Sequence, residues 1–475
     1  MADQQSTTDF KLTSVLIFPL GNDKDGLEIK NLVYNFSYIE NITSPFVAGT
    51  LSVADSAGLL NDLPIQGGET VKIAVNTSTS KDPVEYVLNV YKIGNRFAKN
   101  QMQSYTLGLV SLEALNNEYY RVRRKFSKKA DEIIAEILNT DLKTKKVLYS
   151  EPTRYSLSYI PPNKRPFDIF SSLAIKSVSA AAAAVPISST SSANKNKTGK
   201  ETVKGTAGFF FWETRRGYNF FAVDSLLSDE PVKNNGKVQY DVKPWGPYIE
   251  KIVNSSDGAD DRFTIINATF SSELDVITSM RKGRYSSSMS FFNHSTGQYK
   301  PLHYSLAQNY DQMKHLGPQN KPNIIKVGKD KTLSDYPTRI MTFLLDHETW
   351  FNDPQPASND PKDGSSSPSQ FCDEHMNYAA QAITRYELLQ NQTATIVIPG
   401  NSEICAGDKI NIKLVNKLSN VDQNKQPYDP ESSGVYLIRE ITHTYEATVS
   451  TNGRFTSTLR LMRDSFGDIE SKHGQ

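Results

Sequence analysis

Cysteine, histidine and long apolar runs are scarce in this chain of 475 residues, and neither sign of charge predominates. The two cysteines, Cys372 and Cys405, are too few for a disulfide framework or a four-cysteine zinc site. The 53 basic and 52 acidic residues nearly cancel, whereas a free nucleic-acid-binding protein needs a basic excess to neutralise phosphates. The composition therefore excludes small secreted scaffolds and metal fingers, and it argues against a free nucleic-acid binder.

Membrane and export signals are also missing. Residues 1–9 are polar and show no basic stretch followed by an apolar core, so they do not have the pattern of a signal peptide. A bilayer span needs about 20 apolar residues, and the best candidates, residues 15–20 and 209–212, are only as long as a strand. We expect a soluble protein, made in a cytoplasm, without stable membrane insertion.

No residue pattern identifies an active site. The pair His347-Glu348 lacks the second histidine of a zinc-protease helix. Serine-hydrolase, phosphate-loop and dinucleotide-binding motifs are absent from the sequence. The seven histidines are scattered along the chain: His294, His303, His315, His347, His375, His443 and His473. We therefore expect no catalytic, cofactor-binding or metal-binding residue, and no cofactor.

Single reactive side chains have plain structural explanations. Cys405 lies between Ile404 and Ala406 on an expected strand, which favours a buried apolar thiol over a nucleophile. Glu440 stands beside Arg439, and no pair of carboxylates suggests the facing acid and base of a glycosidase.

Residues 10–115 have the pattern of a small antiparallel β domain. Residues 71–75 alternate apolar and small or polar side chains, with the period of two that marks a half-buried strand. Residues 86–91 and 105–110 are rich in β-branched and aromatic types. Turn-forming residues separate these segments, so a barrel or sandwich is predicted.

Helices are expected at four places. Apolar residues share one face over residues 130–138, with Ser127 as the N-cap, and Pro166 suits the first position of a helix over residues 166–175. A short helix over residues 273–281 should end at Gly283. A longer one is predicted over residues 376–389, with Asp373 as N-cap and Met376, Ala380, Ile383 and Tyr386 on the buried face.

Two stretches break the pattern. Residues 176–205 are rich in alanine, serine and lysine and offer few large apolar side chains, so we expect a mobile surface loop within a domain. Residues 285–370 are polar and read as irregular, with few clear elements.

Strands return elsewhere in the second half. Residues 208–214 and 215–221 are expected to form a hairpin with Gly217 near its turn, and residues 263–268 a further strand. The C-terminal strands are predicted at residues 393–398, 409–414, 435–444 and 455–462.

An internal echo links the two β regions. Residues 68–73 read Gly, acid, x, β-branched, x, Ile, and residues 407–412 repeat that order. A strand pair follows each segment. Either the echo is a duplication or it reflects turns common to any two β domains. A duplication predicts that residues 64–110 and 398–462 form antiparallel strands in the same order.

An ordered set of motifs resembles the central baseplate hub proteins of contractile-tailed bacteriophages, which are related to the hub part of type VI secretion spike proteins. No single motif is specific, but the set covers most of the chain except residues 176–205 and much of 285–370. The matching segments are residues 36–42, 45–46, 49–59, 63–69, 112–118, 165–168, 208–214, 217–220, 398–401, 406–408, 434–438 and 461–467.

The resemblance implies a mainly β (α+β) fold with two tail-tube-like antiparallel β-barrels, inserted smaller α/β subdomains and assembly as a trimeric ring. On this basis the first barrel is residues 1–115, and the second is discontinuous, residues 248–284 and 390–465. Residues 116–247 form an accessory α+β domain that contains the loop 176–205, residues 285–389 form an inserted domain, and residues 466–475 a tail.

The family role is a structural adaptor in the virion baseplate, assembled in the host bacterial cytoplasm. The implied partners are two further copies of the chain, the trimeric central spike and the tail tube or tube-initiator proteins. Surrounding wedge proteins and the tape measure protein are further candidates, and DNA passes through the lumen without specific binding.

Two other functions stay open from the residues alone. One is a tail-associated peptidoglycan-degrading enzyme, although no lysozyme-like helical segment or zinc motif is recognisable. The other is a glycan-binding tail protein, which an aromatic cleft within residues 285–370 would favour. Its candidate aromatics, which are more often core or interface residues, are Tyr285, Phe291, Phe292, Tyr299, Tyr304 and Tyr310.

Overall fold

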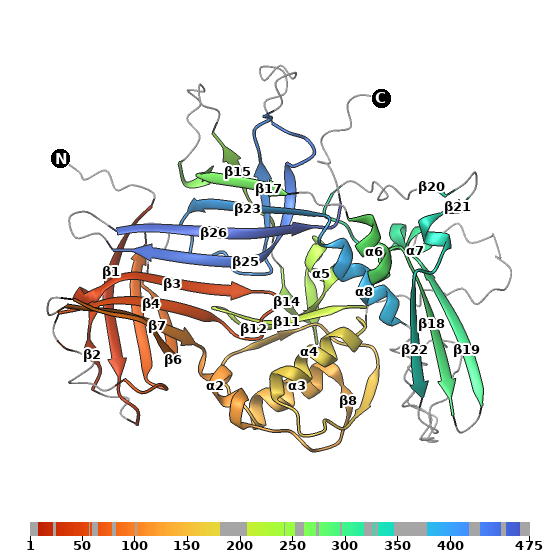
Figure 1. The fold of residues 1–475 in the computed structure, drawn as a ribbon, viewed down its shortest axis with the longest axis horizontal. Helices are drawn as coiled ribbons and strands as arrows, with labels where there is room; N and C mark the ends of the chain where they lie inside the picture. The colour runs from red at the N-terminus through yellow and green to blue at the C-terminus, as the bar shows by residue number, and fades with distance from the viewer. Residues whose placement is uncertain are drawn as a thin grey trace.

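The computed structural model of the chain is mainly β, as expected, and most of its strands belong to one large sheet. Strands fill the left and upper parts of Figure 1, and helices gather below and to the right of them. The structure describes residues 8–21, 25–56, 58, 65–77, 82–99, 102–180, 207–241, 243–251, 261–271, 275–294, 297–317, 326–327, 331–345, 378–417, 428–447 and 453–465.

The first seven strands form one set of neighbouring strands. Their order is β1-β5-β6-β7-β4-β3, with every neighbour antiparallel. β2 precedes β3 on the same stretch of chain and pairs back to β1 through Leu16↔Glu28 and Ile17↔Leu27. The first set comprises β1 (Asp9–Phe18), β2 (Leu27–Glu28), β3 (Val33–Asn41), β4 (Ala48–Asp55), β5 (Thr70–Thr77), β6 (Val84–Lys99) and β7 (Met102–Val110).

Seven later strands repeat this arrangement. Their order is β15-β24-β25-β26-β23-β17. β16 pairs with β15 and is followed directly by β17, as β2 pairs with β1 and precedes β3. The second set comprises β15 (Trp245–Glu250), β16 (Thr264–Ile265), β17 (Asn267–Ser271), β23 (Gln392–Pro399), β24 (Lys409–Lys413), β25 (Gly434–Glu446) and β26 (Gly453–Arg463).

The two sets match strand for strand, both in chain order and in sheet order, with one difference. β1 is antiparallel to β5, whereas its counterpart β15 runs parallel to β24. The expectation of like-ordered antiparallel strands over residues 64–110 and 398–462 is confirmed, because β5-β6-β7 and β24-β25-β26 are both antiparallel meanders.

The match extends to single hydrogen bonds. The amide of Gly68 donates to the carbonyl of Val90 at 2.6 Å, and the amide of Gly407 donates to that of Ile438 at 2.9 Å. Val90 and Ile438 each donate in return to the acidic residue after that glycine, at 2.9 Å in both sets. A β-bulge follows directly after Val90 and again after Ile438. The sequence echo is therefore a repeat in three dimensions as well.

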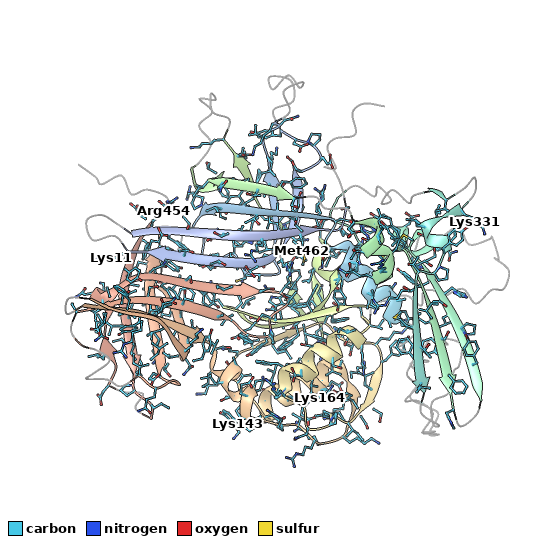
Figure 2. All side chains as sticks on the ribbon, viewed as in Figure 1. Lys11, Lys143, Lys164, Lys331, Arg454 and Met462 are labelled. Atoms are coloured by element: carbon cyan, nitrogen blue, oxygen red, sulfur yellow. The ribbon has the colours of Figure 1, made fainter. Side chains whose placement is uncertain are left out.

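Each set encloses its own apolar core. β5 alternates buried and more exposed residues along its length, because successive side chains of a strand point to opposite faces. The first core includes Val15, Ile73 and Leu107, and the second includes Ile410 and Met462. Met462 is labelled in Figure 2, where side chains fill the space between the strands around it. Each core is thus built mainly around one strand set, although residues from outside that set also join it.

Strand pairing joins the two sets into one sheet. β25 is antiparallel to β3 from Glu440↔Asn41 to Glu446↔Asn35, and β26 meets β1 at Arg454↔Asp9 and Gly453↔Phe10. The end of β25 thereby reaches the first core. The red and blue strands meet along this line in Figure 1.

Residues 112–240 form an accessory unit beneath the sheet, with α3 and α4 packed beside a three-stranded sheet of order β11-β12-β9. The expected hairpin is confirmed as β11 and β12. The expectation that Ser127 caps α3 is wrong, because Ser127 lies in β8 and Lys129 precedes the helix. The elements are α2 (Leu112–Tyr119), β8 (Phe126–Lys129), α3 (Ala130–Thr140), β9 (Leu148–Ser150), β10 (Ser156–Tyr159), α4 (Pro166–Lys176), β11 (Phe209–Thr214), β12 (Gly217–Ala222), α5 (Val223–Leu227), β13 (Val232–Asn234) and β14 (Lys237–Tyr240). Residues 181–205 of the expected loop lie outside the described residues.

The expectation of an irregular segment over residues 285–370 is wrong where the structure describes it. β18 lies between β19 and β22 in a three-stranded sheet. Its serines hid the strand, since serine is not a strand-favouring residue; the hydroxyl of Ser286 donates to the Tyr304 carbonyl at 2.9 Å. The elements are η2 (Asp261–Phe263), α6 (Val276–Lys282), β18 (Ser286–Asn293), β19 (Gln298–Ser305), α7 (Leu306–Asn309), η3 (Tyr310–Gln312), β20 (Lys326–Val327), β21 (Lys331–Thr332), η4 (Leu333–Asp335), β22 (Arg339–Leu345) and α8 (Ala379–Leu388).

Two predicted helices need smaller corrections. α6 ends at Gly283 in the left-handed conformation, as expected, but begins at Val276 after an Asp275 cap. α8 covers the described part of the segment expected to be helical, while Met376 and Asp373 lie outside the described residues. Ala380 is buried as expected; Ile383 and Tyr386 are only half-buried.

Gly407 offers a direct test of the packing between the loop before β24 and Trp212 of β11. Its φ is +91°, and a Cβ there would lie 2.5 Å from Cζ2 of Trp212. Gly236 has a similar φ of +77° and nothing within 4 Å of its Cβ position. We predict that Gly407→Ala lowers the free energy of unfolding by more than Gly236→Ala does, since only the first adds a clash to the shared backbone strain of about 1 kcal/mol. Denaturant unfolding of both variants measures the difference, and equal losses would contradict it.

Candidate functional site at the joints of the fold

The histidines do not gather into a site in the described part of the chain. His294 and His303 are exposed, whereas His443 is buried beside the hydroxyl of Ser457 at 2.9 Å. Burial lowers the pKa of His443 to about 4, so it is neutral near pH 7. No group of three or more metal-binding side chains occurs among the residues that the structure describes. His347, His375 and His473 lie outside them.

Cys405 is buried as expected, but it lies in the loop before β24 and not on a strand. Burial raises the pKa of its thiol well above the ordinary value, which leaves little reactive thiolate. Glu440 receives a hydrogen bond from Asn41 at 2.7 Å and pairs with Arg460 at 3.3 Å. The contacts of Cys405 and Glu440 are thus those of structural residues.

The aromatic residues considered for a glycan cleft are mainly core residues. Tyr285, Phe291, Tyr304 and Tyr310 are buried in the cluster between the three-stranded sheet and α8. Tyr299 is 62% exposed, on the outer face of that sheet. These positions do not form an aromatic-lined cleft.

The most concentrated buried charge lies instead where the units of the fold meet. The first joint is at Glu40 on β3, a carboxylate that is 1% exposed. One oxygen accepts the amide of Arg215 in the β11–β12 turn at 2.6 Å, and the other accepts the amide of Ala406 before β24 at 2.9 Å. One side chain thus connects both strand sets with the accessory unit.

An ion pair reinforces this joint. Arg216, next to Arg215 in the turn, places its two terminal nitrogens 2.8 and 2.9 Å from the two oxygens of Asp408. Such a two-pronged contact fixes orientation as well as distance. Asp408 also accepts the amide of Cys405 at 3.1 Å, as Glu69 accepts that of Gln66 at 2.7 Å in the first set.

A second joint holds α2 and β11 together. Lys146 places its ammonium 2.6 Å from Glu113 and 2.5 Å from Glu213. The other oxygen of Glu213 accepts the amide of Val47 at 3.1 Å. Because Val47 precedes β4, the first strand set is connected to the accessory unit a second time.

The third joint is a buried network around Arg385 of α8. Its guanidinium contacts Asp224 of α5 and lies 3.2 Å from Asp464, just after β26; all three side chains are fully buried. Asp464 also contacts Nδ1 of His315 at 2.6 Å, while Nε2 of that ring faces the Tyr310 carbonyl at 2.9 Å. The two ring nitrogens thus connect the segment around Tyr310 with the end of β26.

Neighbouring groups keep the Asp464 carboxylate ionised. Burial alone would raise the pKa of Asp464, but the hydrogen bond and charge of His315, together with Arg385, hold that pKa well below its ordinary value. The network fixes the accessory unit, the inserted unit and the second set to one another.

Sequence reasoning missed all three joints. A charged residue in a sequence resembles a solvent-facing one, and its partners here are distant, as with Arg385 and Asp224. One signal was available: the acidic residue of the sequence echo, Asp408, sits in a repeated turn where its side chain closes the loop.

Three comparisons place the chain among known proteins. No family model and no curated protein matches it. Among solved structures, a tail protein from Neisseria meningitidis MC58 is 9% identical with a TM-score of 0.46, covering 96% of this chain and 97% of that one. A 43 kDa tail protein of prophage MuSo2 from Shewanella oneidensis has the same identity and TM-score, with coverages of 95% and 99%.

An Escherichia coli protein described as a component of the type VI secretion system is 9% identical with a TM-score of 0.40, covering 96% of this chain and 77% of that one. These structural neighbours are described as tail proteins and as a type VI secretion component. No helix in the described ranges combines the length and apolar character required to span a bilayer.

The Arg385 network makes a prediction about stability. Arg385→Met leaves Asp224 buried without its counter-ion and leaves Asp464 with His315 alone, so we expect a loss of about 3–5 kcal/mol in the free energy of unfolding. Lys282→Met is the matched control, because the Lys282–Glu387 pair at 3.2 Å is largely exposed on the lysine side and should contribute less than about 1 kcal/mol. Urea unfolding compares them; losses of similar size would show that the network is not a structural joint.

Glu40 makes a prediction about pH. Burial raises its pKa to about 7, against the two amides that lower it. Its contribution to stability is therefore complete below the ordinary pKa of a glutamate, 4.5, and is lost as the pH rises through about 7. We predict that the stability advantage of the wild type over Glu40→Gln shrinks between pH 5 and 8, because glutamine does not titrate. Denaturant unfolding across this range tests it; an advantage that grows with pH would exclude the assignment.

Proposed function

We propose that this chain is a structural hub protein in the baseplate of a contractile phage tail. In this role three copies form a ring that joins the six-fold tail tube to the three-fold central spike. The observation that carries the proposal is the repetition of one seven-strand order within a single chain. The ordered sequence motifs that resemble hub proteins support the same role.

The physical argument concerns symmetry. Three chains with two similar strand sets each offer six similar units around one axis, while the chains themselves repeat three times. One face of such a ring can match a six-fold tube and the other a three-fold spike. The role is structural and needs no catalytic group or cofactor.

We assign the first tube-like barrel to residues 1–115 and the second to residues 248–284 and 390–465, with the start moved to Trp245 because β15 begins there. Residues 116–244, shortened from 116–247 by this move, and residues 285–389 are then units outside the barrels, and residues 466–475 a tail. We expect the units outside the barrels to contact wedge or tape measure proteins.

The lumen of the proposed ring would let DNA pass during ejection. Each neutralised phosphate adds affinity that slows transit, so a passage works best when it binds DNA weakly. The formal net charge of +1 is compatible with that requirement.

The solution mass tests the ring. Light scattering across a concentration series should give a species of three chains, each of 53.1 kDa. If the chain alone is a monomer, adding the trimeric spike protein should produce a complex that contains three copies of it. A chain that stays monomeric in both preparations would contradict the ring.

A further inference from the structure

We propose that neighbouring copies of this chain join through a β-sheet junction between the outer edge of β6, residues 92–99, in one copy and the outer edge of β17, residues 267–271, in the next. The inference rests on the proposed function and deepens it by naming the surfaces in contact. Inside the chain, the second strand set contacts the first. The inference assumes that the first set contacts the second set of the neighbouring copy in the same way.

The junction inside the chain supplies the geometry. β3 of the first set pairs with the second half of β25 over seven residue pairs, from Glu440↔Asn41 to Glu446↔Asn35. The end of β25 thereby brings Tyr445 into the first core, where its hydroxyl lies 2.8 Å from that of Tyr86. The junction thus combines edge pairing with an aromatic contact.

Both partners of this junction have counterparts at the outer sides of the chain. β6 corresponds to β25, because each pairs with the next strand and carries a bulge at the same place. β17 corresponds to β3, because each pairs with the strand that follows it in its set. The counterpart of the junction is therefore a contact between β6 of one copy and β17 of the next copy in the ring.

In the described part of the chain, these two edges are not paired. Beyond Val90, β6 pairs only with β7, and β17 pairs only with β23. An open strand edge presents unsatisfied amides and carbonyls that favour pairing with another chain. Each edge is therefore a template of the type that the internal junction already uses.

Exposed apolar side chains lie at both edges. Phe97 on β6 is 63% exposed and Tyr91 54%. Beside β17, Phe263 and Ile266 are 42% and 43% exposed. Burial of such side chains between copies would add hydrophobic stabilisation to the strand pairing.

The internal register predicts the register between copies. Thr442↔Ile39 within the chain corresponds to Gly94 opposite Ser271 of the next copy, since both members hold the same places in their strands. After the bulge between Gly94 and Phe97, the counterpart of Thr444↔Ser37 places Phe97 opposite Thr269. The contact is shorter than the internal one, because β17 has five residues and β3 has nine.

Cysteine cross-linking tests this register. In a chain with Cys372→Ser, we expect Phe97→Cys combined with Thr269→Cys to give disulfide-linked products of two and three chains on a non-reducing gel. The control pair Ser37→Cys with Thr444→Cys should close within one chain. Phe97→Cys with Ala268→Cys, shifted by one residue to the opposite face, should cross-link at least tenfold less.

A second pair of variants tests the surface without cysteines. Phe97→Asp should dissociate the three-chain species at concentrations where Val87→Asp retains it. Val87 is the matched control because it is 53% exposed on the same strand, where that strand already pairs with β5.

The outcomes separate the two proposals. A three-chain species by light scattering that shows no cross-link at Phe97 and Thr269, or an equal cross-link in the shifted pair, overturns the junction and leaves the ring intact. The absence of a three-chain species, both alone and with the spike protein, overturns both.

Discussion

The pairing of β3 with β25 is the interaction on which the rest of the structure depends. It joins the two strand sets into one continuous sheet. It also lets each set complete the other, since Tyr445 and Phe455 of the second set belong to the first core. Backbone hydrogen bonds define the register of such a contact, and aromatic side chains add buried area. The relative orientation of the two sets follows from this one line of contact.

Buried charges then hold the other units against the sheet. Glu40, Glu213 and Arg385 each connect segments that are far apart in sequence, by contacts to amides or to opposite charges. A hydrophobic contact of the same size would tolerate sliding, whereas a buried carboxylate between two defined donors requires one arrangement.

The sequence predicted the strands of both sets well, because alternation and β-branched residues mark half-buried strands such as β5 directly. It also predicted the repeat through the echo around Gly68 and Gly407. It failed for β18, whose serines find partners only in the folded chain. The buried joints were invisible for the same reason: a lone Arg385 in a sequence cannot be distinguished from a surface arginine until its distant partners are known.

The opposite direction of β15 has a further consequence. Two repeats that were identical would be interchangeable, and no ligand could distinguish one from the other. β15 runs parallel to β24, whereas β1 runs antiparallel to β5. The two repeats therefore differ at this strand and can be distinguished by a binding partner. Any assembly that places them alternately around an axis is marked at every second position. A partner with half the rotational order then has a single way to align.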